Sequence, residues 1–149
     1  MKIFKIILLV LLIVFVGIQF IPTTRNKNDK VPKTDFMIVN NVPQGINTAI
    51  QTSCYDCHSN NTHYPWYSSI QPGAWFMESH IKDGKAELNF NEWGELSNRR
   101  KKSKLKSIIS QIEDNEMPLS SYTLIHRNAI FSETQKQRII QYLTALKNN

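Results

Sequence analysis

The chain has 149 residues, of which 18 are lysine or arginine and 12 are aspartate or glutamate, giving a formal net charge of +6. This length is sufficient for one domain with one hydrophobic core. The basic surplus gathers between residues 99 and 106 without any aromatic side chain, which argues against single-stranded nucleic-acid binding. We interpret that run as a solvated linker and helix start, and no nucleic-acid partner is expected.

The first 22 residues are the most apolar part of the chain. Lys2 and Lys5 precede a stretch from Ile6 to Ile21 that carries no charge. Such a stretch is typical of a signal peptide or of a single membrane-anchoring helix. It ends in bulky residues where a signal peptidase requires small ones, so the sequence favours an uncleaved transmembrane anchor over a signal peptide.

Residues 23–45 are expected to form a spacer, since they are rich in Pro, Thr, Asn and Lys. The sequence therefore predicts three parts. Residues 1–22 are a signal peptide or membrane anchor, residues 23–45 are the spacer, and residues 46–149 are the domain.

The domain is predicted to be mainly α-helical with long loops, because alternating runs and hairpin signals typical of strands are scarce. Ile46, Ile50 and Cys54 recur at intervals of four, which predicts a short helix over residues 46–58. The segment between residues 64 and 93 is rich in proline and aromatic residues. We expect it to consist of loops and short helical turns.

Two further helices are predicted in the last third of the chain. Apolar residues line one face of residues 103–115, and a similar stripe follows residue 132. Ser132 and Gln135 form the pattern of a capping box, which predicts that the last helix begins there.

Residues 53–58 read SCYDCH, and this Cys-x-x-Cys-His pattern is typical of covalent attachment of a c-type haem. Cys54 and Cys57, one helical turn apart, can form thioethers with the two vinyl groups on one edge of the porphyrin. The adjacent His58 can then bind the iron as the proximal ligand. The motif predicts one covalently bound haem c, with its iron, per chain.

Three other interpretations of the motif remain open. A redox dithiol normally follows a strand in a βαβ unit, and no strand pattern precedes Cys54. A zinc site built from both cysteines with His58 and His63 would use adjacent ligands, which suit tetrahedral geometry poorly. A disulfide across two residues would contribute little chain-entropy stabilisation. The haem interpretation is therefore favoured.

The stretches SCYDCHSNNTHYPWYSSIQP, WFMESHIKDGKAELNFNEW and EMPLSSYTLIHRNAIFSETQKQRIIQYL extend the pattern beyond the motif. Over about residues 36–146 they resemble the family known as the haem-binding domain, with its CHSN, YPWY, LNF–W and MP–Y–H elements in order. Phe76 departs from the family, in which a second tryptophan often follows the position of Trp75. The resemblance implies a small c-type cytochrome-like fold with an N-terminal hydrophobic segment and one haem.

Met117 is the leading candidate for the sixth iron ligand. The run Glu116-Met117-Pro118 falls between the second and third predicted helices, in the order found in small c-type cytochromes. A thioether sulfur favours ferrous iron and raises the reduction potential, and the following proline stiffens the loop. His80 is the main alternative, since residues 75–80 could form a helical turn facing the ring. Weaker alternatives are His63, His126 and Met77.

Large aromatic side chains are expected to line the haem crevice, because they exclude water and can hydrogen-bond a propionate. Ordinary core packing is an equal alternative for each of them. They are Trp66, Tyr67, Trp75, Trp93 and Tyr122.

These features predict a membrane-anchored, extracytoplasmic monohaem cytochrome that transfers single electrons and is not an enzyme. The domain would lie on the periplasmic side of the inner membrane, since c-type maturation occurs outside the cytoplasm. Its partners would be membrane or periplasmic redox proteins. A haem-based sensor or a peroxidase-like enzyme with an open sixth site is the alternative.

Overall fold

The structure is a computed structural model and describes residues 1–148. Over this range the chain forms seven α-helices and three short 3-10 helices without any strand, so the predicted mainly α fold is confirmed. The elements are α1 (Lys2–Ile18), α2 (Phe36–Val39), α3 (Gln44–His58), η1 (Trp66–Ser69), α4 (Gly73–Glu87), η2 (Phe90–Glu95), α5 (Asn98–Glu113), α6 (Ser120–Thr123), η3 (Arg127–Ala129) and α7 (Glu133–Asn148).

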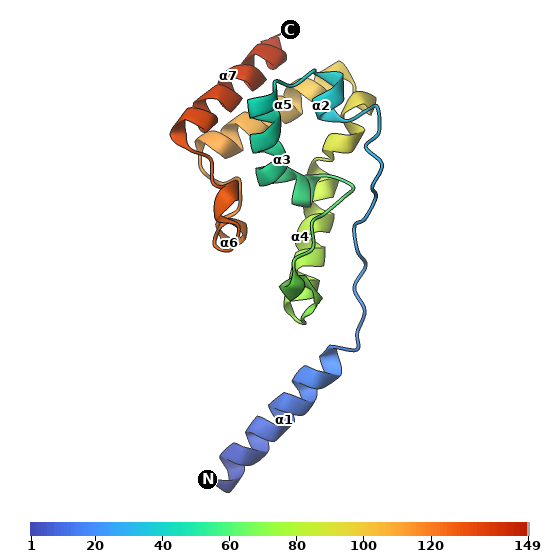
Figure 1. The fold of residues 1–149 in the computed structure, drawn as a ribbon, viewed down its shortest axis with the longest axis vertical. Coiled ribbons are helices and arrows are strands. Elements are labelled where there is room, and N and C mark those ends of the chain that lie inside the picture. The colour runs from blue at the N-terminus through green and yellow to red at the C-terminus, as the bar shows by residue number, and fades with distance from the viewer. Residues whose placement is uncertain (149) are drawn as a thin grey trace.

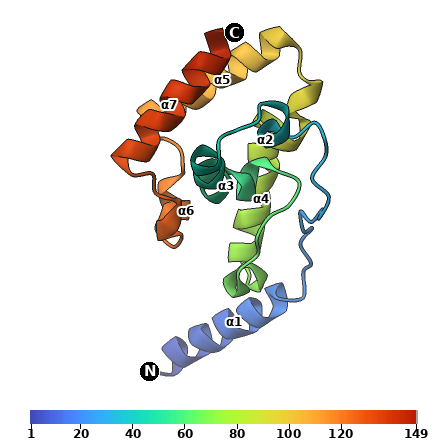
Figure 2. The ribbon, with the colours of Figure 1, turned by 45° about the horizontal axis from the view of Figure 1, so that its top comes forward.

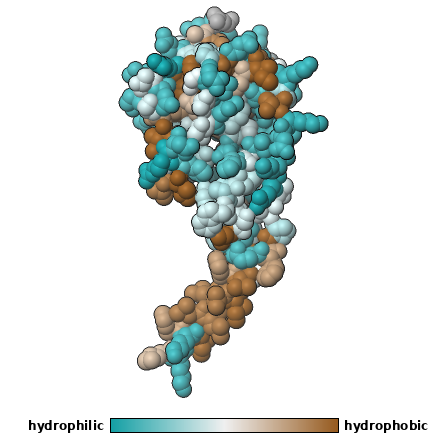
Figure 3. All heavy atoms as spheres, in the orientation of Figure 1, coloured by the Kyte–Doolittle hydropathy of each residue, from teal (hydrophilic) through white to brown (hydrophobic). Residues whose placement is uncertain are grey.

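α1 projects away from the other helices, which pack together into one body (Figure 1). None of its 17 residues is buried, and its surface is apolar along most of its length (Figure 3). No helix within residues 1–148 combines the length and the apolar character needed to cross a membrane. The expected transmembrane helix is therefore not found there.

The start of the expected spacer is hydrogen-bonded to the domain, most extensively at Asn26. The backbone N–H of Asn26 donates to the Tyr64 hydroxyl at 2.7 Å, and its side-chain amide donates to Thr62 Oγ1 at 2.9 Å. Lys85 Nζ donates in turn to Asn26 Oδ1 at 2.7 Å. This segment follows one side of the domain as an extended strap (Figure 2).

The second half of the expected spacer belongs to the core. Asp35 caps α2 by accepting the Met37 N–H at 2.9 Å, and both Phe36 and Met37 are buried. The Phe36 ring meets Trp93 edge-on, with 4.9 Å between centroids. The packed domain thus begins before residue 46, because α2 completes its core.

α3 matches the predicted helix over residues 46–58. α4 does not match the loops and turns expected between residues 64 and 93, since it is a continuous helix of 15 residues. Only Ala74 and Ile81 on α4 are buried, so its apolar pattern is too sparse for the sequence to reveal.

α5 begins at Asn98 rather than at residue 103, because the Ser97 hydroxyl accepts the Arg100 N–H and caps the helix. The run of basic residues is therefore the first half of a helix. The capping box before α7 is confirmed: Ser132 N–H donates to Gln135 Oε1 at 2.9 Å, and Gln135 N–H donates to Ser132 Oγ at 3.2 Å. α5 and α7 lie side by side in both ribbon views (Figures 1 and 2).

Candidate functional site

A cavity of about 500 Å³ lies between α3, α4, α5 and the segment that follows α5. This volume is within the range of sites that hold small molecules and cofactors. Its walls are largely apolar, contributed by Leu88, Phe90, Ile108, Ile112, Leu119 and Phe131.

The end of α3 presents Cys54, Cys57 and His58 to this cavity. The two cysteines are free thiols. Burial, with a smaller contribution from Cys57, raises the pKa of Cys54 to about 12. Burial, with a smaller contribution from Asp56, raises the pKa of Cys57 to about 11. A redox dithiol requires a lowered thiol pKa, so this environment disfavours the dithiol interpretation.

His58 is held in a defined orientation. Its Nδ1 lies 3.0 Å from the Leu88 carbonyl oxygen, which can only accept, so Nδ1 carries the proton. In the neutral ring, Nε2 then has a free lone pair, as an imidazole that binds a metal requires. The Phe90 ring lies edge-on at 6.3 Å and supports the imidazole from one side.

α4 approaches the motif closely because Gly84 has no side chain. A Cβ at this position would lie 3.0 Å from the Cys57 carbonyl oxygen and 3.4 Å from His58 Cε1. Backbone at 3.0 Å cannot move aside easily, so glycine is needed for this contact. The contact sets the width of the cavity between α3 and α4.

Met117 lines the same cavity from the segment after α5. The Gln111 carbonyl oxygen accepts two backbone N–H groups, from Glu116 at 2.9 Å and from Met117 at 3.1 Å. These bonds fix the loop against the end of α5. The structure therefore brings the predicted proximal and sixth ligands, far apart in the sequence, to one cavity.

His80 also lines the cavity, from α4. Its Nδ1–H donates to the Phe76 carbonyl oxygen at 2.9 Å, and its ring contacts the Phe76 ring at 4.1 Å. Both candidates for the sixth ligand thus reach the cavity from different elements. The weaker candidates His63, Met77 and His126 are not among its lining residues.

Tyr122 is the one predicted wall aromatic that lines the cavity. Its hydroxyl donates at 2.7 Å to Oδ2 of Asp56, which lies between the two cysteines on α3. Burial raises the pKa of Tyr122. The His126 ring stacks on Tyr122 at 4.2 Å, and its Nε2 is hydrogen-bonded to the Tyr67 hydroxyl at 2.6 Å. This chain of side chains connects α6 to both α3 and η1.

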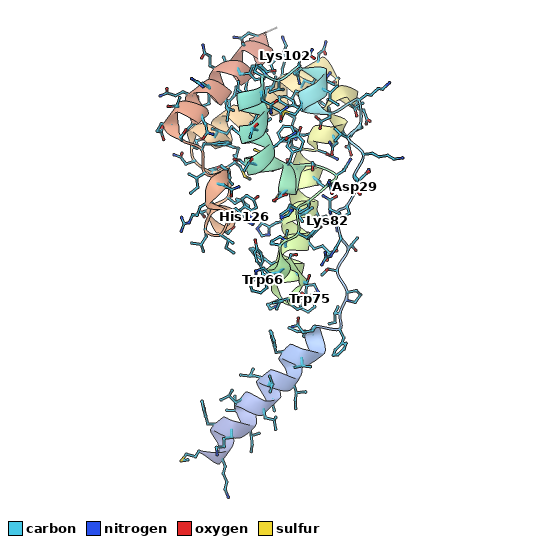
Figure 4. All side chains as sticks on the ribbon, in the orientation of Figure 1. Asp29, Trp66, Trp75, Lys82, Lys102 and His126 are labelled. Atoms are coloured by element: carbon cyan, nitrogen blue, oxygen red, sulfur yellow. The ribbon has the colours of Figure 1, made fainter. Side chains whose placement is uncertain are left out.

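The other predicted wall aromatics lie elsewhere. Trp66 on η1 and Trp75 on α4 lie near the end of the domain that faces α1 (Figure 4). Neither of them lines the cavity, nor does Tyr67, which is also on η1. Trp66 is 79% exposed, whereas Trp93 is fully buried against Phe36 in the core. The Trp93 indole nitrogen has no hydrogen-bond partner there.

A polar stripe on α5 was missed by the sequence analysis. Lys104, Ser107 and Gln111 all line the cavity, and Lys104 Nζ lies 3.7 Å from Glu87 Oε2 on α4. The spacing of three and then four residues places them on one helix face. All three residues lie within the helix predicted over residues 103–115, but only the apolar face of that helix was considered.

The described residues do not supply the set of ligands that the zinc interpretation requires. Across residues 1–148, no group of three or more His, Cys, Asp or Glu side chains is arranged to hold a metal ion. His63, the fourth ligand considered, is an exposed residue of the loop after α3. Its backbone N–H donates to Asp56 Oδ1 at 2.9 Å.

Comparison with known families gives one match. The model of the family described as the haem-binding domain matches residues 13–145, which include every cavity-lining residue. No curated protein and no solved structure shows significant similarity to the chain.

Proposed function

The chain belongs to the haem-binding domain family, and from this premise we propose that it is a monohaem c-type cytochrome that carries single electrons outside the cytoplasm. One observation supports this most strongly: Cys54, Cys57 and His58 share a single largely apolar cavity with Met117. Haem binding follows from the family. Covalent attachment of the haem, electron transfer and the location outside the cytoplasm are the parts that we propose.

The residues of the cavity fit a covalently attached haem. Each thiol, of Cys54 and of Cys57, would add across one vinyl double bond, with sulfur joining one carbon and the thiol hydrogen joining the other. His58 Nε2, left free by the bond from Nδ1 to Leu88, would bind iron. Haem would supply an iron that cycles between the ferrous and ferric states.

Met117 is the preferred sixth ligand. Its loop is fixed on α5 by the Gln111 carbonyl oxygen, so the sulfur loses little further freedom when it binds. A thioether in an apolar cavity stabilises ferrous iron and raises the potential. Iron held by both His58 and Met117 would have no position free for a substrate, which suits an electron carrier.

Lys104 is expected to receive a haem propionate. In haem the propionates lie on the edge opposite the vinyl groups, so attachment at α3 directs them away from the two cysteines. Lys104 is the only lysine or arginine among the described residues that line the cavity, and Ser107 and Gln111 continue its face of α5. A carboxylate here would compete with Glu87, whose side chain is 85% exposed and free to leave.

α1 is expected to direct the protein to the membrane, either as an uncleaved segment inserted in lipid or as an export signal. A helix that is apolar on all sides requires apolar surroundings, and α1 finds none within the chain. The domain would then act on the periplasmic side of the inner membrane. Its electron donor and acceptor would be membrane or periplasmic redox proteins.

A second function is favoured by one observation, the presence of His80 in the cavity. Beside an open sixth site this imidazole would serve as the acid–base group of a peroxidase-like enzyme, or as part of a sensor. Carbon monoxide separates the two functions. An electron carrier stays six-coordinate when reduced and does not bind it, whereas an enzyme or sensor binds it rapidly.

The test uses full-length protein matured together with haem in an export-competent cell. We expect a reversible one-electron couple, a low-spin spectrum in both oxidation states and no shift with carbon monoxide. His58→Ala should give little stable haem protein, whereas the matched His63→Ala should behave like the wild type. A high-spin ferrous spectrum that shifts at once with carbon monoxide would reject the electron-carrier function.

A further inference from the structure

The end of α1 is joined to the domain by specific hydrogen bonds. Gln19 Nε2 donates to the Gln71 carbonyl oxygen at 3.2 Å, and Gln71 N–H donates to Gln19 Oε1 at 2.9 Å. Gln71 Nε2 also donates to the Ile21 carbonyl oxygen at 3.2 Å. Gln71 is buried between η1 and α4, so these bonds hold α1 against that end of the domain.

The residues that follow α1 continue this attachment. Thr24 N–H donates to Glu78 Oε1 at 3.1 Å, and Arg25 donates to Ser69 Oγ at 2.7 Å. The Arg25 guanidinium also lies 5.0 Å above the Tyr64 ring. The connection between α1 and the domain is therefore a bonded strap rather than a free linker.

Large apolar side chains are exposed where α1 meets the domain. We define the junction surface as Phe20, Ile21, Trp66 and Ile70, which are 83%, 50%, 79% and 41% exposed. Trp66 lies at the end of the domain nearest α1 (Figure 4). Single exposed apolar residues are ordinary, but this set lies next to α1, an apolar helix without any buried residue.

We propose that the junction surface rests on a lipid bilayer, so that the domain has a fixed orientation on the membrane. This inference depends on the proposed membrane placement of α1. Since Gln19 and Gln71 bond α1 to η1 and α4, insertion of α1 brings the junction surface to the lipid–water boundary. Tryptophan is enriched at that boundary because its ring is apolar and its indole N–H is polar.

Contact with lipid would also explain the exposure of Trp66, a large aromatic residue that lies outside the cavity. Trp66 does not contact the cavity, and no described side chain covers its exposed face. Arg25, at the same end of the domain, would lie at the level of the lipid phosphate groups. Lipid is favoured over a protein partner because the surface is an extension of α1, which requires the same apolar surroundings.

α4 would then act as a spacer between lipid and cavity. It starts beside the junction surface at Gly73, and its cavity-lining residues run from His80 to Glu87. At 1.5 Å per residue, these lie about 10 to 21 Å along the helix from its first residue. A fixed domain would therefore hold the cavity close above the membrane, within reach of a membrane-embedded electron donor.

The test is photocrosslinking of full-length haem protein in vesicles of phosphatidylcholine and phosphatidylglycerol. A small fraction of lipids carries a diazirine near the top of the acyl chain, and mass spectrometry maps the adducts. We expect adducts on α1 and on Trp66 or Ile70. Ile38 and Val39, which are 49% and 39% exposed on α2 at the end of the domain away from α1 (Figure 1), serve as internal controls and should stay unlabelled.

Single substitutions distinguish contact of the junction surface with lipid from insertion of α1 alone. Gln19→Ala removes two bonds to Gln71 and should lower labelling of the domain severalfold, with labelling of α1 unchanged. Trp66→Ser should lower domain labelling, and the matched Ile38→Ser on α2 should not. Adducts on α1 alone would overturn the junction surface, and adducts on neither would overturn the membrane placement as well. The haem spectrum, recorded in parallel, reports separately on the haem function.

Discussion

The two ends of α4 have different surroundings, although the sequence offered candidate haem-site residues in both: Trp75 near its start and His80 further along. The C-terminal half faces the cavity and packs on the Cys-x-x-Cys-His helix at Gly84. The N-terminal half, with Trp75, lies beside η1 and the end of α1. His80 was singled out because residues 75–80 could form a helical turn, and it lines the cavity, whereas Trp75 was singled out for its aromatic ring and does not line it. Position along a helix, more than residue type, decides which side chains meet.

The largest effect is expected from Met117→Ala. Loss of the sulfur would leave the iron open to carbon monoxide and lower the potential, because water or hydroxide in its place stabilises ferric iron. Met77→Ala, on the N-terminal half of α4 and outside the cavity, is the matched control and should change neither property. Carbon monoxide difference spectra and redox titration measure both. A silent Met117→Ala together with a high-spin His80→Ala would instead assign the sixth ligand to His80.

Gly84→Ala and Gly73→Ala compare the two ends of α4 directly. A Cβ at Gly84 meets Cys57 backbone at 3.0 Å, so we expect a loss of about 1–3 kcal/mol in unfolding free energy and less bound haem. A Cβ at Gly73 comes no closer than 4.0 Å to Tyr67, so the same change should be neutral or slightly stabilising. Urea unfolding of both apoproteins gives the comparison. Equal effects at the two sites would contradict the close packing of α4 on α3.

The thiols of the apoprotein should resist alkylation in the folded state. With burial raising the pKa of Cys54 to about 12, its thiolate is scarce at pH 9, and alkylation should be at least about tenfold slower than in urea. Above pH 9 the unfolded chain loses protons that the folded chain keeps, so stability falls as pH rises toward 12. Replacing both cysteines with alanine should remove this part of the decline. Alkylation at equal rates in the folded and unfolded states would show that the thiols are not buried.

The smallest effect is expected from Lys104→Gln. Loss of a cation beside a propionate should lower the potential by less than Met117→Ala does, because a positive charge near haem disfavours ferric iron. Lys102→Gln, which is exposed on the same helix and outside the cavity, is the control. Redox titration at low and high salt should show the Lys104 effect shrinking as salt screens it. An unchanged potential in Lys104→Gln would remove this residue from the haem environment.

Local signals in the sequence were sufficient for some of this architecture. The helix that carries Cys54 and His58, the capping box at Ser132, and the Met117 loop each depend on residues within one or two turns of one another. The helix that carries Cys54 and His58 and the Met117 loop meet in one cavity. Haem binding could be predicted because the Cys-x-x-Cys-His motif lies within one stretch of six residues, and the family match agrees with it.

Other features depended on tertiary contacts that the sequence does not display. Phe36 sits in a stretch rich in Lys and Asn, and its burial requires Trp93, which is far along the chain. The end of the domain that carries Trp66 lies beside α1 because Gln71 bonds Gln19, a pairing between residues about fifty positions apart. Lys104 falls within the helix predicted over residues 103–115, but its place at the cavity depends on how α5 packs beside α4, where Glu87 lies 3.7 Å away.

The central claim is that haem is covalently attached through Cys54 and Cys57 in the cavity of α3, α4 and α5. The most direct measurement is acid–organic extraction of the purified full-length protein, followed by mass analysis of the peptide spanning residues 54–57. The account predicts that haem stays with that peptide, adding the mass of one intact haem, and that Cys54→Ala or Cys57→Ala sharply reduces it. Complete release of haem from the wild-type protein, with two unmodified thiols recovered, would contradict the claim.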